Sequence, residues 1–491
     1  MLLLGIDVGT SSIKVSVVDA QTGKTITAAQ YPETEAGIIA PQPGWAEQSP
    51  MQWWHDVKQA ILKAHATKAY NPKDIRAIGI AYQMHGLVMV DKNQEPLRNS
   101  IIWCDSRAVS IGNLAFESIG EQHCLTHLLN SPGNFTASKL AWVQHNEPGI
   151  YEQADKIMLP GDFIAMQLTG RSTTSISTLS EGVFWDFKNN SLSEAVFGYY
   201  GFPKSLIPEI KDVFTEHGTI TAAVAAELSL TTGIPVTYKA GDQPNNALSL
   251  NVLQPGEVAA TAGTSGVIYA VSDELTYDQQ SRVNSFAHVN HTQTETRTGV
   301  LLCINGTGIA NRWIKNIAAP QMSYGQMNEA AATIEPGSNG LQLLPFGNGA
   351  ERMLNNEIVG CQLENIDLNV HTAAHLFRAT QEGIAFAFRY GLDIMRENGI
   401  QPGIIRAGKA NMFLSNVFTE AFVNVTNTPV ELHDCDGSVG AAIGAGIGAG
   451  IYGSAAEAFS HQKALATIEP TKSILYDELY TKWKKQLLKF L

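Results

Sequence analysis

Two short stretches of glycine and hydroxyl residues, far apart in the chain, have the residue types that bind phosphate. Each stretch lies between two apolar runs, so each is predicted to form the turn of a β-hairpin. Glycine has no Cβ and lets backbone N–H groups approach an anion closely, and the hydroxyls add further donors. The residues expected to hold phosphate are Gly9, Thr10, Ser11 and Ser12 in the first turn and Gly263, Thr264 and Ser265 in the second.

Two aspartates lie where phosphate chemistry needs a carboxylate. Asp7 ends the strand before the first turn, where it could hold a magnesium ion through water, whereas the second turn has Thr261 at the matching position. Asp242 closely follows the apolar strand 235–240, and a carboxylate there could accept the proton of a reacting hydroxyl. An ordinary aspartate is ionised at neutral pH, so this role requires no large pKa shift. The alternative is a helix N-cap, before the helix expected over 246–253.

A third buried strand, over 75–81, ends in a string of polar residues. In open α/β sheets, ligands gather beyond the carboxyl ends of the strands. Gln83, Met84 and His85 are therefore candidates for a small-molecule site. The alternative for a lone histidine is a structural role with its hydrogen bonds satisfied, and the residues alone leave this choice open.

Similar elements in the two halves of the chain must position these candidates. The chain has 491 residues, more than one ordinary core accommodates. Strands are expected over 2–6, 13–18 and 25–31 around the first turn, and the pattern of strand, turn and strand recurs over 258–270. We therefore predict a duplicated α/β unit whose two turns clamp a polyphosphate between two domains.

The second half contains further candidates in its loops. Gly306 lies in a loop of small residues, and Gly408 and Asn411 follow the strand expected over 404–407. The stretch 437–456 has no charge, but its apolar content is mostly alanine, which is too weak for a membrane span. We expect it to form a tightly packed helix inside a soluble domain.

Composition and charge exclude several classes of protein. Hydrophobic residues make up 44% of the chain and charged residues 16%, which is typical of a soluble globular enzyme. The net charge of −13 and the lack of a basic run argue against nucleic-acid binding. The five cysteines are scattered, without metal-ligand spacing, and indicate reduced thiols in a cytoplasmic protein. The apolar stretch that begins at Met1 is too short for a signal peptide, and it lacks the basic residues with which a signal peptide starts.

The paired Gly-Thr-Ser turns resemble those of the actin-like ATPase superfamily, and other motifs narrow the resemblance to the FGGY family of carbohydrate kinases. These motifs are Gly44-Trp45-Ala46-Glu47-Gln48, the run Thr136–Trp142, and the helix and strand expected over 417–430. The string Gln83-Met84-His85-Gly86 resembles the substrate motif of the xylulokinases within this family. The resemblance covers essentially residues 1 to 450.

The resemblance implies an α/β fold of two actin-like ATPase (ribonuclease H-like) domains with a deep cleft between them. It implies an N-terminal domain over 1–250 that binds the sugar and carries the first phosphate hairpin. A nucleotide-binding C-terminal domain over 251–450 and a packed helical tail over 451–491 follow. ATP and Mg²⁺ are the implied cofactors, with Asp242 as catalytic base and Asp7 at the metal.

The other candidates receive roles from the same resemblance. The implied sugar pocket contains Gln83, Met84, His85, Asp242 and Asn246, and ATP is expected to contact both turns together with Gly306, Gly408 and Asn411. The family turn around 407–409 is richer in glycine, so the backbone path here is an open question. The implied partners are a small-molecule sugar and ATP, with a homodimer as a family expectation and no nucleic acid or membrane.

The implied activity is transfer of the γ-phosphoryl group of ATP to a hydroxyl of a ketopentose, with D-xylulose as the first choice. Asp242-Gln243 is reminiscent of glycerol kinases, whereas xylulokinases more often have Asp-Asn, so another kinase of the family, for glycerol, gluconate or ribulose, is the first alternative. A chaperone-type ATPase would need a peptide-binding domain, for which little chain is left. An inactive sugar sensor conflicts with the intact pair Asp7 and Asp242.

Overall fold

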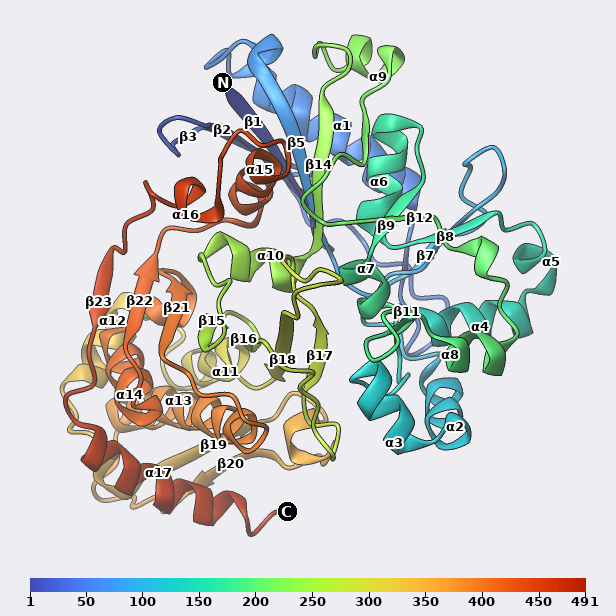
Figure 1. Cartoon of the computed structure of the whole chain (residues 1–491). Helices are drawn as coiled ribbons and strands as arrows, with labels where there is room; N and C mark the ends of the chain where they lie inside the picture. Colours follow the sequence, from blue (N-terminus) through green and yellow to red (C-terminus); the bar gives the residue numbers. More distant parts are fainter.

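Two large mixed β-sheets dominate the computed structural model, which describes residues 1–491 (Figure 1). The first sheet consists of β1 (Leu2–Val8), β2 (Ile13–Asp19), β3 (Thr25–Tyr31), β5 (Ile75–Tyr82), β13 (Gly218–Thr219) and β14 (Pro235–Gly241). Its order is β13-β14-β5-β1-β2-β3. The neighbours β14, β5 and β1 run parallel, and β2 is antiparallel to both β1 and β3.

The second sheet repeats this arrangement. It consists of β15 (Glu257–Ala262), β16 (Gly266–Ser272), β17 (Asn284–Ala287), β18 (Thr298–Ile304), β21 (Ile404–Gly408), β22 (Val430–His433) and β23 (Ala466–Ile468), in the order β17-β18-β16-β15-β21-β22-β23. The run β18-β16-β15-β21-β22 has the same order and strand directions as β3-β2-β1-β5-β14. The predicted duplication is confirmed, with two ribonuclease H-like sheets and one Gly-Thr-Ser turn in each.

Helices from both halves of the chain cover the first sheet. One face packs against α1 (Pro50–Ala66) and α6 (Pro160–Thr169), and the other against α10 (Asp242–Ser249) and α15 (Gly437–Gly448). The approach of α15 is close: a Cβ at Gly5 would lie 1.7 Å from the Ser438 carbonyl oxygen, and one at Gly79 only 2.0 Å from that of Ala441. The uncharged stretch near residue 437 thus forms a helix held against the sheet of the other half.

The second sheet carries its own helical layer. The helices that build it are α11 (Gly308–Ala318), α12 (Tyr324–Ala332), α13 (Ala373–Glu397), α14 (Asn416–Thr426) and α17 (Ser473–Leu487). Trp483 of α17 is fully buried and donates its indole N–H to the Leu343 carbonyl at 2.8 Å. On the opposite face, α10 contacts β15 and β16 as well as β14, β5 and α15. The helix α10 is therefore the element that lies between the two sheets (Figure 1).

Most of the chain between β5 and β14 forms a helical lobe beside the second sheet (Figure 1). Its elements are β6 (Val88–Val90), β7 (Ser100–Ile101), α2 (Val109–Ile119), α3 (Glu121–His123), α4 (Thr136–Asn146), α5 (Pro148–Tyr151), β8 (Lys156–Met158), β9 (Thr173–Ser175), α7 (Ile176–Glu181), β10 (Trp185–Asp186), β11 (Ser191–Leu192), α8 (Glu194–Tyr200) and β12 (Glu209–Lys211). The remaining elements are β4 (Glu47–Gln48), α9 (Ala222–Glu227), β19 (Gln342–Phe346), β20 (Gly360–Glu364) and α16 (Ala455–Ala458). The lobe contacts β17, where the Asn130 side chain donates to the Ser285 carbonyl at 2.6 Å and accepts the Ser285 N–H at 3.1 Å. None of the helices combines the length and the hydropathy that crossing a membrane requires.

Candidate active site

The carboxyl ends of three neighbouring strands bring the N-terminal candidates together. The parallel strands β1 and β14 flank β5, with Val8 and Gly241 on either side of Tyr82. Asp7 lies near the end of β1, Gln83 follows β5 and Asp242 follows β14. The three side chains therefore start from one edge of the first sheet, as the rule for open α/β sheets predicts.

Asp242 is the first residue of α10, so the predicted helix start at Asn246 is wrong. The polar residues before Asn246 suggested a loop, but polar groups and proline are tolerated in a first turn, whose N–H groups have no partner within the helix. The residue before the helix must be glycine, because a Cβ at Gly241 would lie 2.5 Å from Glu181 Oε1 and 2.7 Å from Met84 Cγ. The Asp242 carboxylate is thus held at a helix N-terminus, where a negative charge is favoured.

The carboxylates at this edge repel one another. Partial burial, together with the charge of Asp7, raises the pKa of Asp242 to about 7. Burial and the charge of Asp436 raise the pKa of Asp7 to about 6, against the opposing effect of Lys14. The role of a base requires no pKa shift, but the fold raises this pKa because it buries Asp242 and gathers carboxylates that are distant in the sequence. A divalent cation relieves such repulsion, so this edge fits the Mg²⁺ expected beside Asp7.

Gln83 and Met84 shape the edge through contacts within the protein. The Gln83 amide donates to Gln48 Oε1 at 3.0 Å and accepts the Thr10 hydroxyl at 3.3 Å. It therefore links the first hairpin turn to the end of β5. Met84 is buried against Gly241, next to the base candidate.

Asn246 is less constrained than its neighbours. It lies one turn along α10 from Asp242, and residues four apart share a helix face. The neighbouring Asn245 is instead buried and donates to the Gly437 carbonyl at 2.9 Å. Asn245 thus ties α10 to α15, and Asn246 stays a candidate for the sugar pocket.

His85 is fixed in an unusual conformation between the two domains. Its backbone φ is 62°, a left-handed value that costs energy outside glycine. Its ring packs 4.8 Å from Phe135 and 5.3 Å from Phe286 of β17, measured between ring centres. Burial, aided by the charge of Lys139, lowers the pKa of His85 to about 3, so the ring is neutral.

The hydrogen bond of the His85 ring fixes its tautomer. His85 Nδ1 lies 3.1 Å from the Glu181 carbonyl oxygen, which can only accept, so the proton is on Nδ1. In the neutral ring, Nε2 is then an acceptor. His85 can therefore accept a hydrogen bond from a hydroxyl of a sugar.

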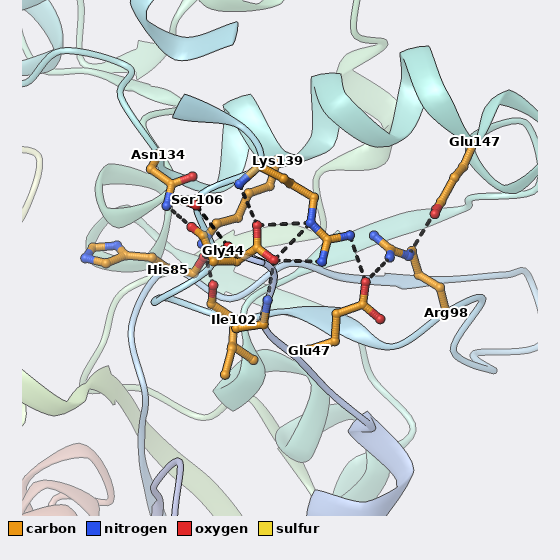
Figure 2. Close-up of polar contacts among 12 residues, drawn as sticks. Gly44, Glu47, His85, Arg98, Ile102, Ser106, Asn134, Lys139 and Glu147 are labelled. Carbon is orange, nitrogen blue, oxygen red and sulfur yellow. Dashed lines mark hydrogen bonds and ion pairs between the residues drawn. The ribbon is translucent and has the colours of Figure 1, made fainter. Parts of the chain in front are cut away.

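A buried lysine holds the backbone at His85 (Figure 2). Lys139 has no exposed surface, and its ammonium donates to the carbonyl oxygens of His85 at 2.9 Å and of Ile102 at 3.0 Å. Thr136 adds a weaker hydroxyl contact to the same His85 oxygen at 3.3 Å. These donors stabilise the left-handed turn that presents the imidazole.

Behind Lys139 lies a chain of ion pairs (Figure 2). Asp105 and Arg107 are buried, 2.7 Å apart between Oδ2 and Nη2, and Arg107 also pairs with Glu47 at 2.8 Å. The Arg107 guanidinium lies 3.8 Å from the ring centre of Trp45. Such a stacked and paired guanidinium is rigid. Asp105 and Arg107 therefore have a structural role.

Replacing Lys139 should weaken sugar binding selectively. In Lys139→Met the two carbonyl acceptors lose their donor, and leaving such buried groups unpaired costs about 1–3 kcal/mol each. We expect the KM for the sugar to rise by at least about tenfold while the KM for ATP changes little, measured by steady-state kinetics. Lys63→Met removes a lysine that is exposed in the same domain and should leave both constants unchanged. Equal losses for sugar and ATP in Lys139→Met would contradict a role at His85.

The first hairpin turn is held by hydrogen bonds from residues distant in the sequence. The Gly9 N–H donates to the Ser12 carbonyl at 3.2 Å, which closes the turn. The Thr10 hydroxyl accepts from the Trp103 indole N–H at 3.0 Å, and the Thr10 carbonyl accepts from the Gln48 amide at 2.8 Å. Trp103 is 52% exposed, unusual for so large an apolar ring. It offers an apolar wall beside the turn.

A cavity of about 320 Å³ lies beside the second hairpin turn. It is lined by Ala262, Gly263, Thr264, Gly308, Ile309, Asn311, Arg312, Tyr324, Asn328, Asn411, Met412, Leu414 and Ser415. The carbonyl oxygens of Gly263 and Thr264 accept the first N–H groups of α11 at 2.9 and 3.0 Å, which fixes the turn against the helix. Apolar side chains with interspersed amides suit the flat base and ribose of a nucleotide.

The predicted nucleotide residues fall into two groups. Those that line the cavity are Gly263, Thr264 and Asn411, whereas Ser265 of the same turn is not among the lining residues. Gly306 does not: its N–H donates to the Glu351 carboxylate at 3.2 Å, and a Cβ there would lie 1.6 Å from the Pro345 carbonyl oxygen. Gly408 ends β21 beside Cys435, whose Sγ would lie 3.0 Å from a Cβ. Both glycines thus satisfy packing needs in the structure.

The sequence indicated no role for several residues of the site. They are Lys139, Glu181, Trp103, Arg312, Tyr324 and Asn328. Burial and the charges of Asp242 and Asp162 raise the pKa of Glu181 well above its usual range, which favours its neutral form beside Gly241.

Comparisons with known proteins agree with this arrangement. Residues 2–249 match the N-terminal domain of the FGGY family of carbohydrate kinases, and residues 258–449 match its C-terminal domain. The chain is 29% identical over 407 residues to a xylulose kinase of Escherichia coli, covering 82% of this chain and 80% of that protein.

Solved structures show the same fold. A xylulose kinase from Rhodospirillum rubrum superposes with a TM-score of 0.89 at 25% identity, covering 100% of this chain and 99% of the other. A gluconate kinase from Lactobacillus acidophilus has the same TM-score of 0.89 at 21% identity, over 99% and 98% of the two chains. The fold is therefore common to kinases of different sugars, and the shape alone does not select one.

Proposed function

The chain belongs to the FGGY family of carbohydrate kinases, and on that basis we propose that it phosphorylates a ketopentose, D-xylulose first, with ATP. The observation that carries the proposal is the meeting of Asp7, His85 and Asp242 at one sheet edge, with the cavity of about 320 Å³ beside the second hairpin. The edge of the first sheet has Asp242 as the base and His85 as a hydrogen-bond acceptor for the sugar. The cavity beside the second hairpin has room for a nucleotide. Phosphoryl transfer needs this positioning more than it needs covalent help.

Asp242 is the proposed base. Its carboxylate would accept the proton of the attacking sugar hydroxyl while that oxygen bonds to the γ-phosphorus and the bond to the leaving ADP oxygen breaks. Bound Mg²⁺ would neutralise the phosphate charge, and Asp7 is the residue placed to hold it through water. The turns at Gly9–Ser12 and Gly263–Ser265 would hold the phosphates.

The sugar side of the proposal rests on His85. Its neutral ring has an acceptor nitrogen for a hydroxyl, and Met84 and Trp103 supply apolar surface nearby. The Gln-Met-His-Gly string and the xylulose kinases among the relatives favour xylulose. The gluconate kinase adds no support for a sugar acid, because its similarity to this chain is one of fold.

A substrate panel tests the choice of sugar. ADP release should be measured with D-xylulose, L-xylulose, D-ribulose, glycerol and D-gluconate, at equal Mg·ATP. We expect D-xylulose to give the highest kcat/KM. A higher value for gluconate would reject the ketopentose, and no sugar-dependent ADP release at all would reject the kinase assignment for this chain.

The pH profile should show the raised pKa of Asp242. Only the deprotonated carboxylate accepts a proton, so kcat/KM should fall by about tenfold per pH unit below a pKa of about 7. In the profile of kcat, the fall should begin at a lower pH, because a cation beside Asp7 removes part of the repulsion that raises the pKa of Asp242. Both profiles can be measured by coupled ADP assays with the coupling enzymes in excess. A kcat/KM that stays flat down to about pH 5 would contradict the assignment.

A further inference from the structure

Two histidines and an aspartate lie together in the helical lobe, among residues that the proposed phosphoryl transfer does not use. His123 ends α3, His127 lies in the next turn and Asp186 ends β10. The two imidazoles stack with centres 4.0 Å apart and planes 18° apart. One nitrogen of each ring and one Asp186 oxygen all lie within 4.8 Å of one another. Three donor atoms therefore already surround a small space.

We propose that His123, His127 and Asp186 form a binding site for a divalent transition cation, with Zn²⁺ as the best fit. Two imidazoles and one carboxylate suit Zn²⁺ and its neighbours, whereas Mg²⁺ prefers oxygen ligands. Donors around tetrahedral Zn²⁺ lie about 3.4 Å apart, given bonds of about 2.0–2.2 Å. Because imidazole lone pairs lie in the ring plane, the two stacked rings would have to tilt apart for both to reach one cation, and water would complete the coordination.

The aspartate is already oriented for this role. Asp186 Oδ1 accepts the Asn189 N–H at 2.9 Å, Oδ2 accepts the Asn189 side-chain amide at 2.8 Å, and His127 Nδ1 lies 3.0 Å from both oxygens. Hydrogen bonds of this kind fix the ligands of metal sites. The carboxylate therefore has little freedom to lose when a cation binds.

One of the histidines has a ring nitrogen without a hydrogen-bond partner. His123 Nε2 is buried and has no hydrogen-bond partner in the protein, an arrangement that costs free energy unless something satisfies it. The His127 side chain is 21% exposed, which leaves a route from solvent. A bound cation would account for a pair of stacked rings with an unsatisfied nitrogen beside a carboxylate.

The backbone between the histidines is also unusual. Residues Cys124–Leu128 form a single π-helical turn, and Leu129 ends it with a φ of 59°. Such turns are rare and occur frequently at functional sites. Here the turn sets the spacing that stacks His123 on His127.

The site lies on the part of the lobe that contacts the second domain. Asn130, just beyond the π-helical turn, is bound to Ser285 of β17, and the next residue, Phe286, packs on His85. A cation would cross-link this turn to β10. It would stiffen the lobe without taking part in phosphoryl transfer.

Zinc titration of the full-length, untagged protein tests the proposal without any need for kinase activity. The protein is first freed of metal with a chelator and then titrated against a chromophoric zinc indicator. We expect one equivalent to bind, and a hundredfold excess over Kd to raise Tm by about 3 °C. His123→Phe keeps the ring stacking, and His127→Asn keeps a donor to Asp186, but each removes a ligand nitrogen. Each variant should lower the affinity by at least about tenfold.

His145→Ala is the matched control, because His145 is an exposed histidine of the same lobe. It should bind zinc like the parent chain. If the parent binds no stoichiometric zinc, or if His123→Phe and His127→Asn bind it as tightly as the parent, the site does not exist. Retained binding in folded ligand variants would assign the zinc to other groups, such as the exposed thiols of Cys104 and Cys303.

Discussion

Asp242→Asn should lower kcat by at least about a hundredfold, and by up to about ten-thousandfold, because it removes the group that accepts the proton of the sugar hydroxyl. Asparagine has nearly the same size and is tolerated equally well at a helix start, so α10 should still form. The KM for ATP should change little, because Asp242 follows a strand of the first sheet, whereas the cavity lies beside the second hairpin. Steady-state rates of ADP release at saturating substrates measure the loss.

Two comparisons keep this result interpretable. The thermal midpoint should stay within a few degrees of the parent, or rise, because the substitution also removes a charge that Asp7 repels. Asp74→Asn, at an exposed aspartate of the same domain, should leave kcat unchanged. A folded Asp242→Asn with normal kcat would remove position 242 from the mechanism.

Gly79→Ala should destabilise the protein by about 3 kcal/mol, near the upper end of overpacking effects. The new Cβ would lie 2.0 Å from the Ala441 carbonyl oxygen, a backbone atom that cannot turn aside as a side chain can. The backbone of Gly79 is not in the left-handed region, so the effect is steric and not conformational. Differential scanning calorimetry should show a Tm lower by about 3 °C, because the entropy of unfolding a chain of this length is about 1 kcal/mol/K.

The control for this clash is Gly149→Ala. Nothing lies within 4 Å of a Cβ at Gly149, which belongs to the short helix α5. Its Tm should stay the same or rise slightly, because alanine restricts the unfolded chain. A Tm for Gly79→Ala equal to that of Gly149→Ala would show that α15 can move away from the sheet at little cost.

The elements with local signals were predictable from the sequence. The hairpins follow from apolar runs that flank glycine and hydroxyl residues, and their repetition indicated the duplicated sheets. Asp7, Gln83 and Asp242 were found because strand ends are recognisable and parallel neighbours share one edge. These inferences need only residue types and their order along the chain.

What the sequence did not reveal depends on contacts between distant segments. Lys139 and Glu181 lie in the lobe, and nothing in their neighbours in sequence shows that they meet His85 and Gly241. The raised pKa of Asp242 likewise depends on burial in the folded chain and on the charge of Asp7, which is distant from it in the sequence. The start of α10 was misplaced because polar residues in a first turn look like a loop.

The glycine-rich helix α15 illustrates the same limit. Its composition indicated close packing, but not that its partners are β1 and β5 of the other half. Gly437 adds a further constraint, since a Cβ there would lie 2.5 Å from Asp7 Oδ2. Only the assembled structure shows that the helix N-terminus and the metal candidate are neighbours.

The placement of α15 also has a consequence for synthesis on the ribosome. The first sheet is complete once β14 has emerged, yet the helix that covers one of its faces is made only after nearly all of the second sheet. Until then β1 and β5 expose apolar side chains to solvent or to a chaperone. A nascent chain arrested before Gly437 should therefore be captured by folding helpers, and the two halves should not survive as independently expressed fragments.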